Sequence, residues 1–313
     1  RGDRAPRRSC MRACRGTVAR SSTLIRGASR RLCSVTSSHY ARAADVYDSA
    51  PFYSTAERNH ETLVGLVVDR LALRAEHRLV DIGAGNGAFT DSLVKRVGGE
   101  RATIVEPSKE FMSGVEAHPS IVAVHASLEE WSKGEERAGG TSHGGRFDRI
   151  LLKEVVHHLG ERSARQESLR QLCAHRLAPD GRLLIVTRHQ EQPQIPLFSA
   201  ARKVWAEQQP SGDELLADLE LAGCARVLLT CATLEYAMPL DEWCALVRRR
   251  FWSTFSHFSD AALDEGVAEI RRNHAEVTRD HGGSSRPQVT IGDRLVLISA
   301  EVGEAVGQPQ GLR

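Results

Sequence analysis

Where a short apolar run meets a cluster of glycines, the chain reads Leu79-Val80-Asp81-Ile82-Gly83-Ala84-Gly85-Asn86-Gly87-Ala88-Phe89. The apolar run has the length of a buried strand, and apolar residues recur at helical spacing from Phe89 onward. The glycines therefore lie between a strand and a helix, where they let the backbone turn tightly and approach a ligand. The helix that follows presents unpaired N–H groups to the same ligand. The stretch predicts a ligand-binding turn.

The elements on either side of this turn indicate the fold class. Strands are expected at 78–82, 102–105, 121–125, 147–152, 182–187, 226–231 and 294–300. Helices are expected from about 56 to 75, after 88, from 109, and over 162–176 and 213–222. Strands that alternate with helices pair in parallel. We therefore predict an α/β fold with a seven-stranded, mostly parallel sheet, helices on both faces, an antiparallel last strand and a helical cap at about 240–280 before it.

Two acidic residues stand where a nucleoside would meet them. Asp81 precedes the first glycine by two residues, and Glu106 ends the next strand, 23 residues after Gly83. A carboxylate in the second place can accept hydrogen bonds from both hydroxyls of a ribose. Asp81 could reach the cationic ammonium of a methionine moiety directly or through water. Taken alone, Asp81 is equally consistent with a strand-end cap and Glu106 with a solvated turn residue.

The glycine turn also satisfies the G-x-G-x-x-G/A pattern of dinucleotide-binding folds, through Gly83, Gly85 and Ala88. An NAD-dependent oxidoreductase is therefore an alternative function. In such enzymes this strand more often begins the chain, whereas here a full helix precedes it. Asp81 would also repel the pyrophosphate of a dinucleotide. Both features make NAD the less favoured ligand.

Four motifs occur in a fixed order: the glycine turn at 79–87, then 105–108 (Val-Glu-Pro-Ser), 147–152 (Phe-Asp-Arg-Ile-Leu-Leu) and 177–185 (Leu-Ala-Pro-Asp-Gly-Arg-Leu-Leu-Ile). In this order they resemble the motifs of class I S-adenosylmethionine-dependent methyltransferases of the small-molecule, type 11/12-like kind. The resemblance covers residues 79–187 closely and the flanks only in general plan. It implies a Rossmann-like fold, S-adenosylmethionine as the cofactor and methyl transfer to a small-molecule acceptor.

The same resemblance implies roles for individual residues. The three glycines of the turn line the methionine portion, Glu106 binds the ribose, and Ser127 with Leu128 flanks the adenine. The acid that usually precedes the adenine contact is replaced here by Ala126-Ser127. The predicted cofactor-binding residues are Asp81, Gly83, Gly85, Asn86, Gly87, Glu106, Pro107, Ser127, Leu128 and Lys153.

The methyl acceptor is expected near the end of the fourth strand, because ligands of doubly wound sheets bind beyond the carboxyl ends of the strands. The chain there reads Lys-Glu-Val-Val-His-His at 153–158. If this segment is helical, Glu154, His157 and His158 share one face. A histidine with a near-neutral pKa could take a proton from the acceptor, or the three side chains could hold a divalent metal.

This segment resembles the Glu-x-x-Glu-His segment of ubiquinone-pathway O-methyltransferases, with His157 in place of the second glutamate. That departure weakens the metal interpretation, so we predict catalytic roles for Glu154, His157 and His158 and no metal. O-methylation is the form of the reaction that this resemblance suggests. His-His-Leu is also widespread in the superfamily, and a structural role is the alternative.

Aromatic residues and arginines concentrate in the predicted cap, although only 5% of the chain is aromatic. They are Trp243, Arg248, Arg249, Arg250, Phe251, Trp252, Phe255 and Phe258. Such a segment could close over an aromatic or anionic acceptor, with one arginine pairing a carboxylate. Alternatively, the aromatics form the buried face of a helix and the arginines its wet face. Tyr40, Tyr47 and Tyr53 are candidates for the other wall of the pocket.

The first part of the chain has the composition of a targeting segment. From Arg4 to Ala44 there is no Asp or Glu, while arginines recur among Ser, Thr and Ala. This is typical of a mitochondrial transit peptide, and 31–34 (Arg-Leu-Cys-Ser) resembles a processing site. We predict a disordered targeting segment at 1–38, a methyltransferase domain at 39–301, a tail at 302–313 and a location in the mitochondrial matrix, with Met11 as the initiator. A disordered basic tail, a plastid location and a cytoplasmic one are the alternatives.

Composition excludes several other classes. No run of 18 apolar residues occurs, so no transmembrane segment is expected. The net charge is +2, and the arginine-rich start makes the remainder mildly acidic, so no nucleic-acid partner is expected. The seven cysteines lack spacings suited to zinc and are expected to be reduced. A noncatalytic organelle assembly factor that keeps a methyltransferase fold is a third possible function.

Overall fold

The structure is a computed structural model, and it describes residues 57–112, 114–133, 145–274 and 287–302. The predicted targeting segment at 1–38, the three tyrosines at 40, 47 and 53, and residues 303–313 lie outside the described residues. None of the described helices has the length and apolar content needed to cross a bilayer.

The described strands form one seven-stranded sheet. They are β1 (Leu79–Ile82), β2 (Ala102–Glu106), β3 (Ile121–His125), β4 (Phe147–Lys153), β5 (Leu177–Arg188), β6 (Cys224–Pro239) and β7 (Gln288–Val302). The described α-helices are α3 (Glu57–Leu71), α4 (Ala88–Val97), α5 (Leu128–Lys133), α6 (Arg162–His175), α7 (Ser199–Gln208), α8 (Gly212–Leu221), α9 (Leu240–Arg248) and α10 (Asp260–Asn273). Short 3₁₀ helices are η1 (Val115–Ala117), η2 (Val156–His158) and η3 (Ser253–His257).

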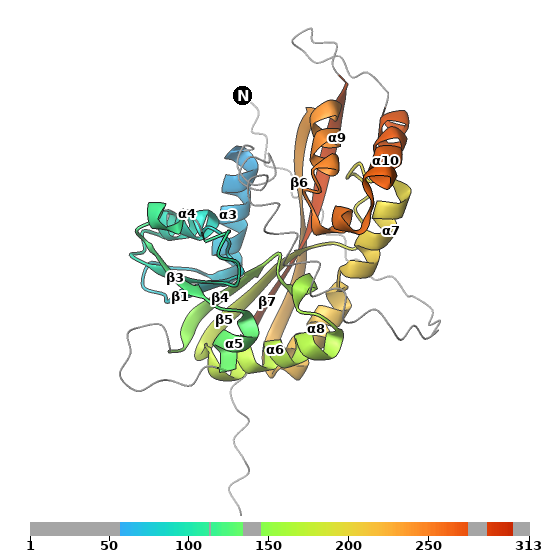
Figure 1. Ribbon diagram of the computed structural model, residues 1–313. Coiled ribbons are helices and arrows are strands. Elements are labelled where there is room, and N and C mark those ends of the chain that lie inside the picture. Colours follow the sequence, from blue (N-terminus) through green and yellow to red (C-terminus); the bar gives the residue numbers. More distant parts are fainter. Residues whose placement is uncertain (1–56, 113, 134–144, 275–286, 303–313) are drawn as a thin grey trace, which may run out of the picture.

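The glycine turn lies where the direction of the strand order reverses. The order across the sheet is β3-β2-β1-β4-β5-β7-β6. β1 pairs in parallel with β2 on one side and with β4 on the other, and β7 is antiparallel to both β5 and β6. In open sheets of this kind ligands bind beyond the carboxyl ends of the strands at the reversal. The topology therefore brings the turn after β1 and the segment after β4 to one end of the sheet (Figure 1).

The two faces of the sheet are covered by different helices. On one face, Leu79, Leu151 and Leu184 share an apolar core with side chains of α3 and α4. On the other, alternate residues of the same strands pack against α5, α6 and α8. All four residues of β1 are buried and all but Asp81 are apolar, so the strand itself places this carboxylate in the core.

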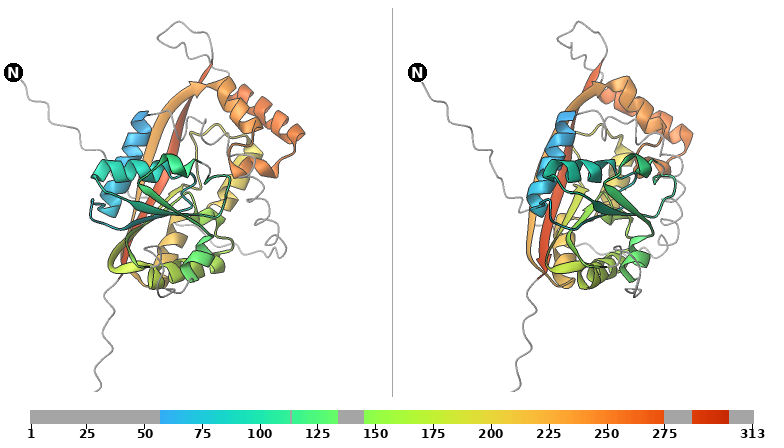
Figure 2. Two further views of the ribbon diagram at one scale, coloured as in Figure 1. Left: turned by 60° about the vertical axis from the view of Figure 1, so that its left-hand side comes forward. Right: turned by 90° about the vertical axis from the view of Figure 1, so that its left-hand side faces the viewer.

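A separate helical unit, formed by α7, α9, η3 and α10, has an apolar core of its own. Figure 1 shows α9 and α10 beside one end of β6 and β7, and α7 extending from them toward α8. The two views of Figure 2 agree that α9 and α10 stand beyond that end of the sheet. The insertion of helices between the sixth and seventh strands is therefore confirmed, whereas α7, which contributes to the same core, was not predicted.

Several element boundaries differ from the prediction. The helix expected from Lys109 is replaced in the described residues by a turn and by η1, because Gly114 adopts a left-handed φ of 93° and Pro119 follows closely. β6 and β7 are longer than expected, and β5 begins already at Leu177, within a segment predicted as a turn. The β6–β7 pairing extends both strands through residues that lack an alternating apolar pattern, such as Glu235 opposite Gly292.

Candidate functional site

The turn after β1 is built on three glycines in left-handed conformations. Gly83, Gly85 and Gly87 have φ values of 69°, 61° and 80°. Side chains are disfavoured there, and at Gly83 a β-carbon would also lie 2.5 Å from Cγ2 of Val155. The Gly83 N–H donates to the Val105 carbonyl at 2.7 Å, which ties the turn to the end of β2. The backbone at this turn is therefore held open to a ligand and fixed to both neighbouring strands.

Glu106 lies at the tip of β2 and faces the glycine turn. Its Oε2 accepts from the Gly85 N–H at 3.0 Å, and its Oε1 accepts from the Ser108 N–H at 2.9 Å. The side chain is buried, and burial raises the pKa of Glu106 while the two backbone donors oppose that shift. The donors fix the orientation of the carboxylate, and each oxygen retains capacity to accept a further hydrogen bond from a ribose hydroxyl.

Asp81 is an almost fully buried carboxylate on β1, 1% exposed. The Thr90 hydroxyl donates to its Oδ2 at 2.6 Å, while its Oδ1 has no hydrogen-bond partner among the described residues. Burial raises the pKa of Asp81 to about 6, and the Thr90 hydrogen bond and the Lys153 charge reduce that shift. A buried acceptor without a partner is unfavourable unless a ligand supplies a donor. The ammonium of a methionine moiety is a donor of the right charge.

Lys153 ends β4 on the same face of the sheet as Asp81. Asp81 pairs with Leu151 in the parallel ladder, and side chains two residues apart along a strand point to the same side. The Lys153 Nζ lies 4.9 Å from the centre of the Phe89 ring, which comes from the first turn of α4. Burial lowers the pKa of Lys153, against the opposing charges of Asp81 and Glu154.

Four other predicted cofactor residues make contacts within the protein. The Asn86 Oδ1 accepts from the Ala88 N–H at 3.1 Å at the start of α4, and the Pro107 carbonyl is 3.0 Å from Nε2 of His125. Ser127 and Glu130 exchange side-chain and backbone hydrogen bonds at the start of α5. The fourth, Leu128, is packed in the apolar core of that face. The predicted roles of these four residues in binding the cofactor stay predictions.

The segment after β4 does not form the helical face that was predicted. Glu154 has a left-handed φ of 61°, and only Val156–His158 form a 3₁₀ turn, so the spacing of an α-helix does not apply. The Glu154 side chain instead pairs with Arg188 through Oε2, and its Oε1 is buried without a hydrogen-bond partner among the described residues. A tertiary contact accounts for the different direction of this side chain, because the Glu154 carboxylate pairs with Arg188 on β5.

The two histidines lie together, with ring centres 3.9 Å apart. Burial, helped by the charge of Arg188, lowers the pKa of His157 to about 3. His157 therefore does not meet the condition of a near-neutral pKa for a histidine base, and it is uncharged at physiological pH. Its Nδ1 is buried and has no hydrogen-bond partner within the described ranges. Within the same ranges no three His, Cys, Asp or Glu side chains are grouped as metal ligands.

The sequence analysis missed Arg188 and Asp293, which complete this region. The Arg188 Nε lies 3.0 Å from both carboxylate oxygens of Asp293 on β7, and its guanidinium stands 5.2 Å from the Trp252 ring centre. Both charged residues are buried. Their positions carried a signal, because Arg188 comes directly after the predicted fifth strand and Asp293 directly before the seventh.

The aromatic residues of the helical unit form its buried core. Trp243, Phe251, Trp252 and Phe255 are at most 4% exposed. Arg248 pairs with Asp264 and Arg250 with Asp260, both on α10. In the structure these two arginines stabilise the helical unit, which confirms the alternative of a buried aromatic face and a wet arginine face. Trp252 is the exception, because it also contacts Arg188 of the sheet.

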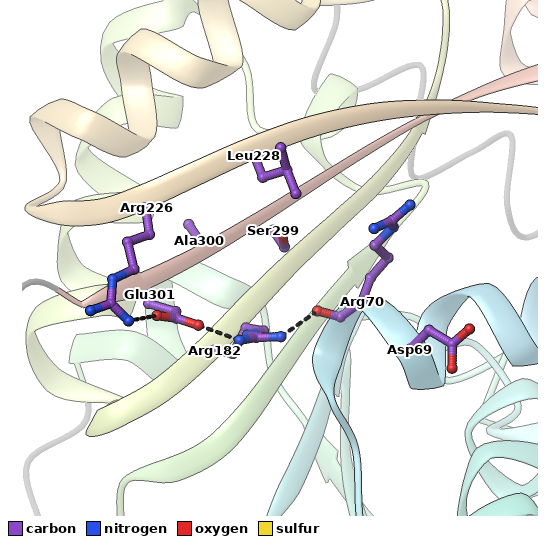
Figure 3. Close-up of a pocket in the computed structure, with 8 residues that line it drawn as sticks. All are labelled: Asp69, Arg70, Arg182, Arg226, Leu228, Ser299, Ala300 and Glu301. Carbon is purple, nitrogen blue, oxygen red and sulfur yellow. Dashed lines mark hydrogen bonds and ion pairs between the residues drawn. The ribbon is translucent and has the colours of Figure 1, made fainter. Parts of the chain in front are cut away.

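A pocket of about 160 Å³ lies away from this region, at the opposite ends of the strands. Figure 3 shows Arg182 and Arg226 on either side of Glu301, which pairs with both. Arg182 also donates to the Arg70 carbonyl. Arg182 and Arg226 are therefore already paired with a carboxylate of the protein, and none of the predicted site residues lines this pocket.

Comparison with known proteins agrees with this geometry. Residues 80–183 match the family described as a methyltransferase domain. Among solved structures, a protein of Anabaena variabilis is described as a methyltransferase from an antibiotic biosynthesis pathway. Its TM-score is 0.50 at 18% identity, and the match covers 76% of this chain and 96% of that protein. No curated protein sequence matches the chain.

Two further solved structures are similar at a lower score. The YcgJ protein of Bacillus subtilis has a TM-score of 0.49 at 19% identity over 78% of this chain and 100% of its own. The N-methyltransferase NodS of Bradyrhizobium japonicum has a TM-score of 0.47 at 13% identity over 86% of this chain and 99% of its own. The family match identifies a methyltransferase domain at residues 80–183, and the glycine turn and Glu106 lie where S-adenosylmethionine, the cofactor of such domains, would be held.

Proposed function

We propose that the protein transfers a methyl group from S-adenosylmethionine to the hydroxyl of a small-molecule acceptor. The observation that carries the proposal is a pair of buried acceptor atoms after β4. Glu154 Oε1 and His157 Nδ1 are both without hydrogen-bond partners among the described residues. Buried atoms of this kind are satisfied when a ligand supplies an O–H or N–H group. They lie at the same end of the sheet as the glycine turn.

The residues around the cofactor support its proposed orientation. Asp81 Oδ1 would receive the ammonium of the methionine portion, the glycine turn would pass beside it, and Glu106 would accept from the ribose hydroxyls. Bound there, S-adenosylmethionine supplies an electrophilic methyl group. Because the donor is already reactive, the protein has mainly to align the acceptor and exclude water.

The acceptor hydroxyl is proposed to meet the uncharged His157 and the Glu154 carboxylate. A histidine whose pKa is lowered to about 3 is a weak base, so it accepts a hydrogen bond from the hydroxyl rather than a full proton before transfer. The Glu154 carboxylate, held by Arg188, would take the proton that the hydroxyl loses as the C–O bond forms. His158, beside His157, is proposed to orient the first ring.

Calorimetry with S-adenosylmethionine, S-adenosylhomocysteine and NADH is the first test. We expect heat with the two sulfur nucleosides and none with NADH; binding of NADH alone would support the oxidoreductase alternative. Incubation with methyl-labelled S-adenosylmethionine and a small-molecule extract, followed by identification of the labelled product, tests the acceptor. Cofactor binding without any labelled product would favour a noncatalytic assembly factor, and a product labelled on nitrogen, carbon or sulfur would refute the oxygen assignment.

The arginine-rich segment at 1–38 supports a separate proposal, location in the mitochondrial matrix. Fractionation of cells that express the full chain with a C-terminal tag tests it. Recovery of the tag in plastids or cytoplasm would refute it.

A further inference from the structure

Lys153 is a partly buried cation beside the turn where the proposed function puts the methionine portion of the cofactor. It follows Leu152, which pairs with Ile82, so it stands level with Gly83 at the start of the glycine turn. Its ammonium is held against the Phe89 ring, at 4.9 Å from the ring centre, in the first turn of the next helix. A ligand that occupies the turn therefore comes to lie beside a lysine.

Three charged groups act directly on Lys153, and they come from β1, from the residue after β4 and from β5. Asp81 on β1 faces it from the neighbouring strand, Glu154 follows it in the chain, and Arg188 comes from the end of β5. Glu106 on β2 acts on Asp81 from the far side of the turn. From α3, His60 contacts the Phe89 ring edge-on at 5.7 Å. Burial favours the neutral amine of Lys153, the two carboxylates favour its ammonium form, and Arg188 disfavours that form.

The two forms of the cofactor differ in charge at this position. S-adenosylmethionine carries a carboxylate, an ammonium and a sulfonium, and its net charge is positive. S-adenosylhomocysteine carries the first two groups and no sulfonium, so its net charge is zero. A lysine ammonium in a partly desolvated site is repelled by a second fixed cation. The donor therefore shifts the protonation equilibrium of Lys153 further than the product does.

We propose that Lys153 is the residue through which this site distinguishes S-adenosylmethionine from S-adenosylhomocysteine, releasing its proton to solvent when the sulfonium binds. The inference rests on the proposed function. Its consequence is that neutral Lys153 binds the donor and the product alike, whereas the ammonium form retains the product and disfavours the donor. After transfer, the loss of the sulfonium lets Lys153 take up a proton again from solvent.

Calorimetry in buffers of different ionisation enthalpy measures the protons released on binding. We expect more protons released by S-adenosylmethionine than by S-adenosylhomocysteine, and the difference should vary with pH across the neutral and alkaline range. Proton release from Asp81 is common to both ligands, since both carry the ammonium, and the difference largely removes it. Where the donor releases one proton more than the product, the affinity ratio of donor to product rises about tenfold per pH unit.

Two substitutions at Lys153 are predicted to act in opposite directions. In Lys153→Met the extra proton release is lost, and the affinity ratio of donor to product rises at neutral pH because no cation opposes the sulfonium. In Lys153→Arg the extra release is also lost, and the ratio falls because a permanent cation remains. Lys203→Met, at an exposed lysine of α7, is the matched control and should leave the ratio and the proton release unchanged.

The outcomes separate the two levels of the inference. If the wild-type protein binds neither ligand, the cofactor orientation fails and the role of Lys153 fails with it. If both ligands bind and release equal numbers of protons, or if the difference persists in Lys153→Met, only the role of Lys153 is overturned. Circular dichroism establishes whether each variant is folded. If Lys153→Met is not folded, Lys153→Arg alone provides the test.

Discussion

Gly83, in the turn after β1, packs against Val155, in the segment after β4. A β-carbon on Gly83 would lie 2.5 Å from Cγ2 of Val155, which is closer than two carbon atoms can approach. The turn proposed to hold the cofactor and the segment proposed to hold the acceptor are therefore packed directly against each other. Their spacing is set by a contact that leaves no room for a methyl group, and alignment of this kind is the main contribution a methyltransferase makes to the reaction.

Replacement of Gly83 tests this contact. Gly83→Ala should destabilise the protein by roughly 2–5 kcal/mol, the sum of left-handed strain and overpacking against Val155. Gly98→Ala is a matched control, because Gly98 has the same φ of 69° with no atom near its missing β-carbon. The control should lose only about 1–2 kcal/mol. Urea denaturation of both variants measures the difference, and equal losses would show that the Val155 contact is not restrictive.

Glu106→Gln should weaken S-adenosylmethionine binding by roughly ten- to a hundredfold, because hydrogen bonds to a charged group are the stronger ones. Glutamine keeps the size of the side chain and still accepts from one of the two backbone donors, so the fold should persist. Glu110→Gln, on the exposed loop that follows β2, is the control for a loss of charge nearby. Calorimetry gives both affinities; equal values would refute the ribose role of Glu106.

Asp81→Asn should stabilise the unliganded protein while it weakens cofactor binding. The pKa of Asp81 is about 6 in the folded protein against an ordinary value of 3.8, so the folded protein binds this proton more tightly than the unfolded chain does. Stability is therefore lost as pH rises from about 4 to about 6, by up to about 3 kcal/mol at neutral pH. Asparagine removes this loss. The prediction fails if the variant is no more stable than wild type at pH 7 in denaturant titrations.

The prediction from sequence succeeded where a local pattern decides the structure. The glycine turn, the strand before it and Glu106 at the next strand end are neighbours in the chain or repeat with the period of their element. Parallel pairing of the first five strands followed from the alternation of strands and helices. The capping role of Ser127 was also visible, since Glu130 three residues later completes the pattern of a capping box. The family resemblance implied adenine binding for Ser127, and that role stays a prediction.

The conformation of Glu154 could not be predicted in this way. Its side chain pairs with Arg188, 34 residues away, and Arg188 in turn is held by Asp293, 105 residues further. No period or spacing within the segment reports such partners. The lowered pKa of His157 has the same origin, because it depends on the burial of the ring and on the same Arg188. The sequence located this segment after the fourth strand but did not predict the geometry of its side chains.

His157 should stay uncharged throughout the mildly acidic range. Its pKa of about 3 reflects burial first and the Arg188 charge second. Nitrogen-detected NMR of the histidine rings, assigned with His157→Gln and His158→Gln, reports the protonation state directly. We expect the His157 ring to remain neutral to about pH 4, one unit above its pKa. A midpoint between pH 6 and 7, the range of an unperturbed histidine, would show that the ring is solvated and would remove the physical basis for its proposed role.

Arg188→Met should be the most destabilising of the arginine substitutions on β5. Arg188 is 5% exposed and is the shared partner of Glu154 and of Asp293, which is 4% exposed. Its removal leaves two carboxylates without their cation, and the loss of one partner from a buried pair costs about 3–5 kcal/mol. Arg182→Met is the matched control, because Arg182 also lies on β5 and pairs with a β7 carboxylate, Glu301, but both side chains are partly exposed.

The control should lose about 1 kcal/mol or less. Because burial raises the pKa of Asp293 while the adjacent Arg188 lowers it, removal of the arginine should raise that pKa further. The deficit of Arg188→Met should then shrink as pH falls and Asp293 becomes protonated, whereas that of Arg182→Met should change little. Denaturation of both variants at neutral and acidic pH measures this. A deficit in Arg188→Met that is independent of pH would mean that lost packing against Trp252, rather than an uncompensated charge, dominates.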